Sequence, residues 1–521
     1  MYLYSLFIPN LAETCALGCR LTQQHSDRSI RRHRTHTLRS MATHGDAAAP
    51  HALLLPYPAQ GHVIPFMELA HRLLDRGFAV TFVNTDFNHR RVVEAAAGAP
   101  PAAGGGRRLR LVGVPDGMGD GQDRDNLVRL NATMQEAMPP RLEALLDGGE
   151  GGEGLGRATC VVVDAGMSWA LDAAKRRGLP TAALWAASAA VLAVIVGAKS
   201  LIRDGVIDDD GAPVKIGSGS SFRLAESMPP MDATFLAWNY MAGSRDAARM
   251  VFHYLTTTAW AAVAKADVLL CNTFPDLEPG ILTPDSPAAS VLPIGPLRTC
   301  RPTTGGEAAP LVGHFWRADG EACLSFLDAQ PQGSVVYVAF GSLAVMSPAQ
   351  LRELALALAL GASGRPFLWV LRPGLAGKLP AELTDMVAQA QHGRLVEWAP
   401  QERVLAHPAV GCFLTHCGWN STLEGIRNGV PLLCWPYFTD QFSNQTYICD
   451  IWRVGMRMTA APVGSRGVVS KEEIVERLES LLGDGGVKER VGKLRELAER
   501  SVSGEGQSLK NLNVFMELMR K

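Results

Sequence analysis

Short apolar runs alternate with segments of helical spacing from His51 to the C-terminus. The first run, HALLLPYP, is followed by VIPFMELAHRLLDRG, whose apolar residues recur every three or four positions and which ends at Gly77. Two Gly-rich loops, at 99–108 and 148–156, interrupt the series. Further apolar runs in this half predict strands; they are FAVTFVNT, RLRLVGVP, ATCVVVDAG, LPTAALWAA and ADVLLCNTF. Apolar strands that alternate with helices predict a parallel sheet covered on both faces.

A second alternating series follows a polar stretch at 298–318, which we interpret as a linker. Its predicted strands are GSVVYVAFGS, PFLWVLRP, GRLVEW, VGCFLTH and VPLLCWP. Its predicted helices run from Pro348 to Leu360, from Ser421 onward, and over about 470–483. The pattern predicts two doubly wound, Rossmann-like α/β domains facing each other across a cleft. They comprise an N-terminal domain at 49–297 and a C-terminal domain at 319–521, whose last helix is a candidate to pack back on the first.

Residues 1–48 contain no segment that such a fold requires. The start lacks a basic region, and an Arg/His-rich stretch precedes Met41, so a secretory signal is not indicated. An organelle transit peptide is one interpretation, and a non-native or disordered extension is the one we favour. The uncharged run from Thr181 to Ala198 is at the edge of membrane-span length, but we interpret it as a buried strand followed by a buried helix.

The composition is that of an ordinary globular protein, with 521 residues, 47% apolar residues and a net charge of −1. No global field would attract nucleic acid or anionic membrane, so an anionic ligand must be held by local geometry. Ten scattered cysteines without a CxxC pair indicate reduced thiols. We therefore expect a cytoplasmic monomer with no nucleic acid partner and no integral membrane contact.

No GxGxxG opens either half of the chain and no GxxxxGK[ST] is present, which argues against a dinucleotide oxidoreductase and a P-loop nucleotidase. A different phosphate site is indicated where strand VGCFLTH meets the next helix. Unpaired N–H groups at a helix start bind phosphate, Gly418 allows close approach, and Asn420 and Ser421 add donors. His416 at the strand end could reach the same anion. The alternative is that Ser421 and Glu424 form only a capping box, S-x-x-E.

Residues on either side of this turn suit a nucleotide sugar. Trp398 could stack on a flat base, and Gln401 could pair with its edge. Asp440 and Gln441, after the next predicted strand, could hold sugar hydroxyls. Taken singly these interpretations are weak, because a Trp before a Pro usually serves packing.

Together, the residues from Trp398 to Gln441 resemble the donor-binding signature box of plant secondary-product UDP-glycosyltransferases (family 1 glycosyltransferases). The segment has 44 residues, begins W-A-P-Q, passes through T-H-C-G-W-N-S-x-x-E and ends D-Q. The resemblance extends over about 50–521 and implies the two-domain GT-B fold with a C-terminal UDP-sugar-binding domain. It implies that Trp398 and Gln401 hold the uracil and that Glu424 holds the ribose. The diphosphate would be bound by His416, Asn420, Ser421 and the backbone of Trp419. The sugar would be held by Asp440 and Gln441.

Three further expectations come from the resemblance. Ser342, in AFGS, is placed where the family has another phosphate contact. A final Gln in the box, here Gln441, goes with glucose as donor sugar, where His often goes with galactose. Many relatives have Thr after the Trp that corresponds to Trp185; here Ala186 follows, so that sugar contact is in doubt and Ser188 is the nearest hydroxyl.

Sugar transfer to a hydroxyl needs a base for the acceptor proton. A lone His such as His62 is more often structural, and an Asp after a strand could merely cap a helix. In the family, a Gly-His after the first strand is the base, and its partner is an Asp about a hundred residues later. Here Asp164 ends CVVVD, 102 positions after His62. Asp172 is the competing candidate, but its position reads as a helix face.

The resemblance implies a single in-line displacement that inverts the anomeric carbon. No cofactor or metal is expected, because the helix dipole, His416 and hydroxyl donors would offset the diphosphate charge; Asp208, Asp209 and Asp210 read as a solvated turn. We expect a UDP-glucose-dependent glucosyltransferase that makes β-O-glucosides of small lipophilic acceptors, phenolics such as flavonoids or monolignols. The acceptor pocket is expected near 228–243 and Trp185 to Val196. The alternatives are another UDP-sugar, such as UDP-galactose or UDP-xylose, and a non-catalytic UDP-sugar-binding protein.

Overall fold

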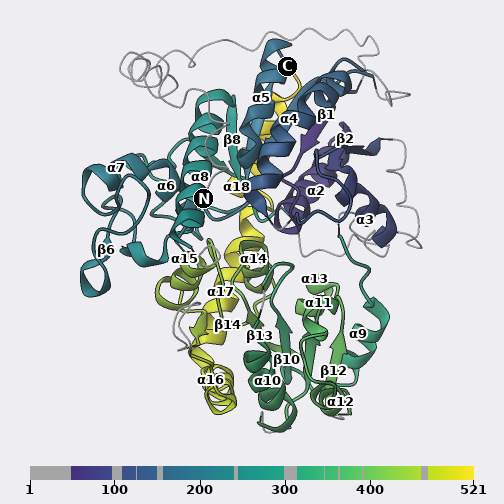
Figure 1. Cartoon of the computed structure of the whole chain (residues 1–521), viewed down its shortest axis with the longest axis vertical. Helices are drawn as coiled ribbons and strands as arrows, with labels where there is room; N and C mark the ends of the chain where they lie inside the picture. The colour runs from purple at the N-terminus through teal and green to yellow at the C-terminus, as the bar shows by residue number, and fades with distance from the viewer. Residues whose placement is uncertain are drawn as a thin grey trace, which may run out of the picture. The chain divides into compact units, whose positions relative to one another are not determined.

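In the computed structural model, the chain folds into two large parallel β-sheets with helices on both faces (Figure 1). From Ala49 to Lys521 the chain is one compact unit. The structure describes residues 49–96, 108–124, 126–148, 156–239, 244–297, 314–344, 346–361, 364–389, 392–458 and 467–521. Our interpretations of residues 1–48, of most of both Gly-rich loops and of 298–313 fall outside these ranges.

The first sheet has the strand order β3-β2-β1-β4-β5-β8-β9, and all its pairs are parallel. Side chains alternate between its faces, so Leu53 and Leu55 pack into one core layer while Ala52 and Leu54 pack into the other. Its strands are β1 His51–Leu55, β2 Ala79–Thr85, β3 Leu109–Val114, β4 Cys160–Asp164, β5 Thr181–Trp185, β8 Val268–Cys271 and β9 Val291–Pro293.

The second sheet has the order β12-β11-β10-β13-β14-β15 and is also parallel throughout. Val336 and Val338 of β10 face one core layer, and Val335 and Tyr337 face the other. Its strands are β10 Val335–Ala339, β11 Phe367–Val370, β12 Gly393–Val396, β13 Val410–Thr415, β14 Leu432–Cys434 and β15 Gly455–Arg457.

Helices connect the strands and cover both sheets. Several begin at a side chain that accepts an N–H of the first turn, as Ser347 does from Gln350. Around the first sheet the helices are α2 Gln60–Asp75, α3 Asp86–Ala96, α4 Leu127–Leu146, η1 Ala165–Ala170, α5 Leu171–Arg176, α6 Ala189–Val196, α7 Ala198–Arg203, η2 Gly217–Gly219, η3 Ala233–Phe235 and α8 Arg245–Lys265. The later ones are α9 Gly320–Asp328, α10 Pro348–Leu356, η4 Ala357–Gly361, α11 Pro373–Ala376, α12 Ala381–Gln389, α13 Gln401–Leu405, α14 Trp419–Arg427, α15 Gln441–Thr446, η5 Tyr447–Ile451, α16 Lys471–Gly483, α17 Gly485–Ser501 and α18 Gln507–Leu518.

The prediction of two doubly wound parallel sheets is confirmed, and each sheet has one point where the strand order reverses. The chain runs from β1 outward to β2 and β3, then returns to the other side of β1 as β4. The second sheet repeats this between β10 and β13. Ligands of such sheets bind beyond the carboxyl ends of strands at these reversal points. His62 follows β1 and Asp164 ends β4, while Ser342 follows β10 and His416 follows β13.

The last helix, α18, packs on the first sheet. Its Leu512, Phe515 and Met516 join the core layer that contains Ala52 and Leu54. The Asn511 side-chain amide donates to the Pro293 carbonyl at the end of β9, over 2.8 Å. In Figure 1 the yellow α18 lies among the purple and teal elements of this sheet.

Several boundaries differ from those predicted. The helix expected from Ser421 begins two residues earlier, at Trp419, because Gly418 takes the cap position. The helix expected to reach Leu360 ends as α10 at Leu356 and continues as the π-helical turn η4. The short strands β9 and β15 and the antiparallel hairpin of β6 (Ser221–Phe222) and β7 (Met231–Asp232) were not predicted.

The uncharged run from Thr181 to Ala198 folds as the buried strand β5 and the buried helix α6, as predicted. None of the helices within the described ranges is both long enough and apolar enough to cross a membrane.

Candidate active site

His62 and Asp164 meet where the first sheet reverses its strand order. His62 lies in the first turn of α2, and its Nδ1 is 2.7 Å from Asp164 Oδ2. The Asp164 carboxylate is buried, whereas 38% of the His62 side chain is exposed. The second carboxylate oxygen, Oδ1, accepts the Gly166 N–H over 2.8 Å. The position of the carboxylate is therefore fixed, and the carboxylate binds Nδ1 of the imidazole. The other ring nitrogen, Nε2, can then accept a proton from a ligand.

Two tyrosines that we did not predict border this pair. Tyr254 of α8 donates its hydroxyl to the Gly166 carbonyl over 2.7 Å. The Tyr57 ring lies 5.2 Å from the His62 ring, centroid to centroid. Tyr254 thereby holds the turn whose N–H binds Asp164, a link that depends on packing of α8 against η1 and leaves no local sequence pattern.

The environment of His62 suits a general base. Burial alone would lower the pKa of His62, but the Asp164 carboxylate outweighs burial and raises it above its ordinary value, with a further contribution from Asp440. Because Nδ1 faces a carboxylate, the neutral ring carries its proton on Nδ1 and presents the Nε2 lone pair. A bound proton would in turn be stabilised by Asp164.

This raised pKa predicts the acid side of the pH–rate profile. A base acts only when unprotonated, so we expect kcat/KM to fall as the pH drops through a value above about 6.5, the ordinary histidine pKa. Initial rates across a pH series, with protein integrity checked at each pH, measure the midpoint. A profile that stays flat well below the ordinary histidine pKa would contradict the assignment of His62 as base.

The turn between β13 and α14, which we predict to bind phosphate, leads directly into a helix. Helix α14 begins at Trp419, and its cap residue, Gly418, has no side chain with which to bind the first N–H groups. The N–H groups of Trp419, Asn420 and Ser421 therefore lack intrahelical partners and present the positive end of the helix dipole. Ser421 lies inside the helix, so the capping-box alternative for Ser421 and Glu424 is wrong.

His416 lies beside this turn, half-buried between two glycines. An added Cβ would come within 2.6 Å of His416 Nε2 at Gly341 and 2.5 Å at Gly418, so both glycines make room for the ring. His416 Nδ1 is buried and has no hydrogen-bond partner within the described part of the chain. Burial, together with Arg372, lowers the pKa of His416 to about 4. Without a bound anion His416 is thus neutral at neutral pH, and in that state it offers the diphosphate a hydrogen-bond donor rather than a full charge.

Gln401 is hydrogen-bonded to two other residues predicted to bind the donor, Ser421 and Glu424. Gln401 Nε2 donates to Ser421 Oγ over 2.9 Å and to Glu424 Oε2 over 2.7 Å. The buried Tyr337 hydroxyl donates to Gln401 Oε1 over 3.2 Å and so orients its amide. Burial, reinforced by the negative charge of Glu402, raises the pKa of Glu424.

Trp398 lies at the end of the second sheet beyond β12, and one of its partners was not predicted. Trp316 stacks on it with ring centroids 4.5 Å apart and an interplanar angle of 29°. The Arg91 guanidinium lies over the Trp316 ring at 4.4 Å. Trp316 belongs to the stretch interpreted as a linker, and nothing in its local sequence indicates this contact.

Asp440 and Gln441 are both engaged within their own loop. Thr439 Oγ1 donates to Asp440 Oδ1 over 2.8 Å, and the buried Asn444 amide donates to Asp440 Oδ2 over 2.8 Å. The same Asn444 amide donates to the carbonyl of Cys417 over 2.9 Å. Cys417 has a left-handed backbone conformation with a φ of 65°. Gln441 Oε1 accepts two backbone N–H groups, so its amide nitrogen is the group left to meet a sugar hydroxyl.

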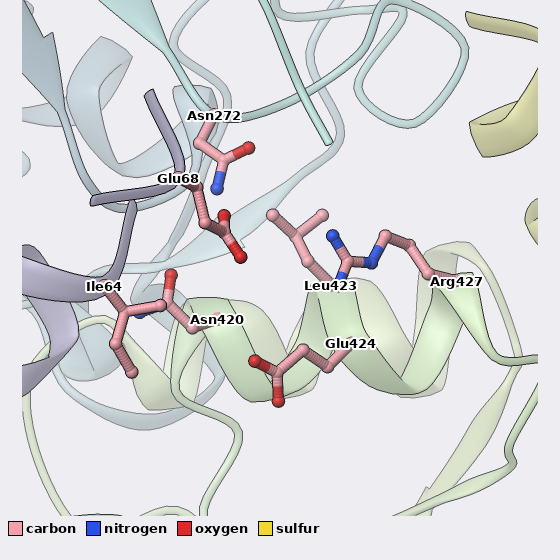
Figure 2. A pocket seen from close by; sticks show the side chains of 7 residues that line it. All are labelled: Ile64, Glu68, Asn272, Asn420, Leu423, Glu424 and Arg427. Atoms are coloured by element: carbon pink, nitrogen blue, oxygen red, sulfur yellow. The ribbon is translucent and has the colours of Figure 1, made fainter. Parts of the chain in front are cut away.

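Helices α2 and α14 bring the two halves of the site together. Asn420 Nδ2 donates to the Gly61 carbonyl, one residue before His62, over 2.8 Å, and Trp419 Nε1 donates to the Asn272 carbonyl over 2.8 Å. Figure 2 shows the small pocket beside this contact, with Glu68 and Asn272 pointing toward α14. The His62–Asp164 pair and the segment from Trp398 to Gln441 therefore lie together in the fold, although more than 200 residues separate them in the sequence.

The remaining candidates have structural partners. Ser188 caps α6, accepting from the Val191 N–H, and is buried. Trp185 and Trp238 are buried core residues whose indole N–H groups donate to the carbonyls of Ser188 and Gly211. Asp172 pairs with Lys265 over 2.7 Å.

The aspartate run at 208–210 forms a turn. The Asp208 carboxylate accepts the N–H groups of Asp210 and Ala212 over 3.0 and 2.8 Å, and it also pairs with Arg245.

Known proteins of similar sequence and structure match nearly the whole chain. The profile of the family described as UDP-glucoronosyl and UDP-glucosyl transferase matches residues 317–501. UDP-glycosyltransferase 83A1 of Arabidopsis thaliana is 35% identical over 475 residues, covering 90% of this chain and 97% of that protein. (R)-mandelonitrile beta-glucosyltransferase of Prunus dulcis is 34% identical, covering 88% and 95%.

A solved structure extends the match to the fold. UGT2 of Phytolacca americana, complexed with UDP-2fluoro-glucose and pterostilbene, superposes with a TM-score of 0.69 at 27% identity and covers 91% of this chain and 100% of that one. The GT-B fold and the enzyme class expected from the signature box are thereby confirmed. The chain belongs to the plant family 1 UDP-glycosyltransferases and is a glycosyltransferase.

Proposed function

We propose that this enzyme transfers glucose from UDP-glucose to a hydroxyl of a small phenolic acceptor and forms a β-O-glucoside. The observation that carries the proposal is the hydrogen-bonded His62–Asp164 pair, 2.7 Å apart, joined to the donor-binding segment through the Asn420–Gly61 contact. A base next to a helix N-terminus is what displacement of a diphosphate by a hydroxyl requires.

In this mechanism His62 Nε2 removes the proton of the acceptor hydroxyl. The acceptor oxygen attacks the anomeric carbon while the bond between that carbon and the diphosphate oxygen breaks. UDP leaves toward the first turn of α14, whose N–H groups stabilise its charge. One displacement inverts the anomeric carbon, so an α-linked donor gives a β-glucoside. We propose no role for a metal ion, because Ser342, His416, Asn420 and the helix N-terminus supply donors to the phosphates.

The glucose preference rests on Gln441. Its carbonyl oxygen is held by the N–H groups of Tyr437 and Phe438, over 2.8 and 3.2 Å, which fixes the direction of its amide nitrogen. A fixed donor discriminates between sugars that differ in the orientation of one hydroxyl, because the wrong epimer leaves a buried group unpaired.

An aromatic pair next to Gln441 supports a flat acceptor. Phe235 of η3 stacks on Phe442 with centroids 5.5 Å apart and an interplanar angle of 14°. Ser443 Oγ also donates to the Phe235 carbonyl over 3.5 Å, which ties η3 to α15. Aromatic side chains next to the residues predicted to hold the sugar suit an acceptor with a planar ring. The Phytolacca americana structure, which holds pterostilbene, supports this choice.

A two-way screen of donors and acceptors tests the proposal. The full chain is incubated with UDP-glucose, UDP-galactose or UDP-xylose and with flavonoids, monolignols and mandelonitrile, and products are identified by mass spectrometry. We expect phenol glucosides, with UDP-glucose preferred by about tenfold or more. Preference for another donor would contradict the role of Gln441. Transfer to mandelonitrile but to no phenol would contradict the acceptor class, and UDP-sugar binding without transfer to any acceptor would indicate a non-catalytic binding protein.

A further inference from the structure

The negative charge of the diphosphate has to be compensated by positive charge in its binding site. UDP leaves with negative charge on its phosphates, yet the side chains predicted to contact them are neutral. Ser342, Asn420 and Ser421 are uncharged, and burial keeps His416 neutral at neutral pH when no anion is bound. The N-terminus of α14 contributes the equivalent of about half a positive charge. The signature box contains two arginines, Arg403 and Arg427, and Arg427 pairs with Glu402. Full charge stabilisation therefore calls for a further cation.

Arg372 is placed to be that cation by the order of the second sheet. Strands β11, β10 and β13 are neighbours in this sheet and run parallel. Their carboxyl ends are followed by Arg372, Ser342 and His416. These three residues, separated in sequence, are thus brought to one edge of the sheet at its reversal point.

The contacts of Arg372 tie it to the turn that carries Ser342. Its Nη1 donates to the Ser342 carbonyl, and its Nη2 donates to the Ala344 carbonyl over 2.6 Å. A guanidinium that binds two carbonyls of one turn fixes both the position and the orientation of that turn. The orientation of Ser342 therefore depends on Arg372.

The same turn lies against His416. Gly341 adopts a left-handed φ of 67°, and an added Cβ there would approach His416 Nε2 to 2.6 Å. The charge of Arg372 reaches His416, since it helps to lower the pKa of that ring. Arg372 is half-buried, so solvent screens its charge less than it would at the surface.

We propose that Arg372 supplies the positive charge of the donor diphosphate site. It holds the turn from Gly341 to Ala344 in place for Ser342 to bind phosphate, and its charge stabilises the negative charge that develops on UDP as the sugar departs. Arg372 is a positioning residue that also acts through space. This inference rests on the proposed function of the same site.

The test compares ligands that differ only in the diphosphate. Calorimetry measures the affinity for UDP and for uridine in Arg372→Gln, in Arg372→Lys and in a control, Arg365→Gln. Arg365 precedes the same strand, β11, and pairs with Glu479 over 2.8 and 2.9 Å. Arg365→Gln therefore also removes one positive charge, but at the opposite end of β11 from Arg372.

We expect Arg372→Gln to weaken UDP binding about 30-fold and uridine binding less than about threefold, because a hydrogen-bonded charge is lost at the phosphates alone. Its kcat with UDP-glucose should fall about 100-fold. NMR titration of the imidazole ring should show a higher pKa for His416. Arg372→Lys should keep the ratio of UDP to uridine affinity within about threefold of the parent protein, since it keeps the charge. The control should change none of these quantities.

Equal loss of UDP and uridine affinity in Arg372→Gln, with an unchanged His416 pKa, would show a merely structural role and overturn the inference. So would unchanged UDP affinity. If Arg372→Gln does not fold, loss of the UDP preference in Arg372→Lys would contradict the inference instead. The binding comparison needs no acceptor, so a parent protein that binds UDP but glucosylates no phenol would refute the proposed acceptor without affecting this test.

Discussion

His62→Ala is expected to lower kcat about 1000-fold, because transfer then has no general base. UDP affinity should stay within about twofold, since His62 lies on α2 and the predicted uridine contacts lie on the second sheet and α14. Initial rates with UDP-glucose and a phenolic acceptor, together with calorimetric titration by UDP, measure both quantities.

His253→Ala is a matched control for this variant. His253 also faces an aspartate, with its Nε2 3.6 Å from Asp210, but both side chains are exposed at the surface. Its removal should leave both rate and UDP affinity unchanged. Near-normal turnover in His62→Ala would exclude His62 as the base, and a parallel loss of UDP binding would indicate general damage to the site.

Asp164→Asn is expected to lower kcat between about 100- and 1000-fold, because the amide keeps the shape of the carboxylate but neither orients the imidazole nor stabilises its protonated form. Loss of the negative charge should also lower the pKa of His62, since Asp164 is the group that raises it. The acid limb of the pH–rate profile should therefore move to lower pH. That shift is a result that simple destabilisation would not produce.

Asp172→Asn provides the comparison for Asp164. Asp172 was the competing candidate from the sequence, and its carboxylate pairs with Lys265 on the helix face instead. This variant should retain full activity and an unshifted pH profile. Were Asp172→Asn to be the more damaging of the two, the partner of His62 would have to be reassigned.

The fold followed from the sequence because its strands are long apolar runs punctuated by Gly and Pro. Runs such as CVVVD and VGCFLT have no other stable place than a sheet covered on both faces. The strands that were not predicted, β9 and β15, have three residues each and are defined by pairing with a neighbour rather than by their own pattern. The start of α14 was misplaced because Ser421 resembles a cap residue, whereas Gly418 takes that position.

The donor-binding residues were predictable because they lie within one contiguous segment. The contacts that join this segment to the rest of the molecule were not, since they depend on which strand ends and helices become neighbours. Asn420 meets Gly61 only after both sheets have formed, and Arg372 binds the Ser342 turn only after β10 and β11 have become neighbours in the second sheet. Trp316 likewise stacks on Trp398 from a distant part of the sequence. The charge state of His416 was also hidden, because its burial between Gly341 and Gly418 has no signature in the local sequence.

The anomeric configuration of the product tests the central claim most directly. The enzyme is incubated with UDP-glucose and a phenolic acceptor, and the anomeric proton of the glucoside product is examined by proton NMR. A single displacement driven by His62 predicts a β-glucoside formed in equal amount with UDP. An α-glucoside, or UDP release with free glucose in place of a glycoside, would contradict the account.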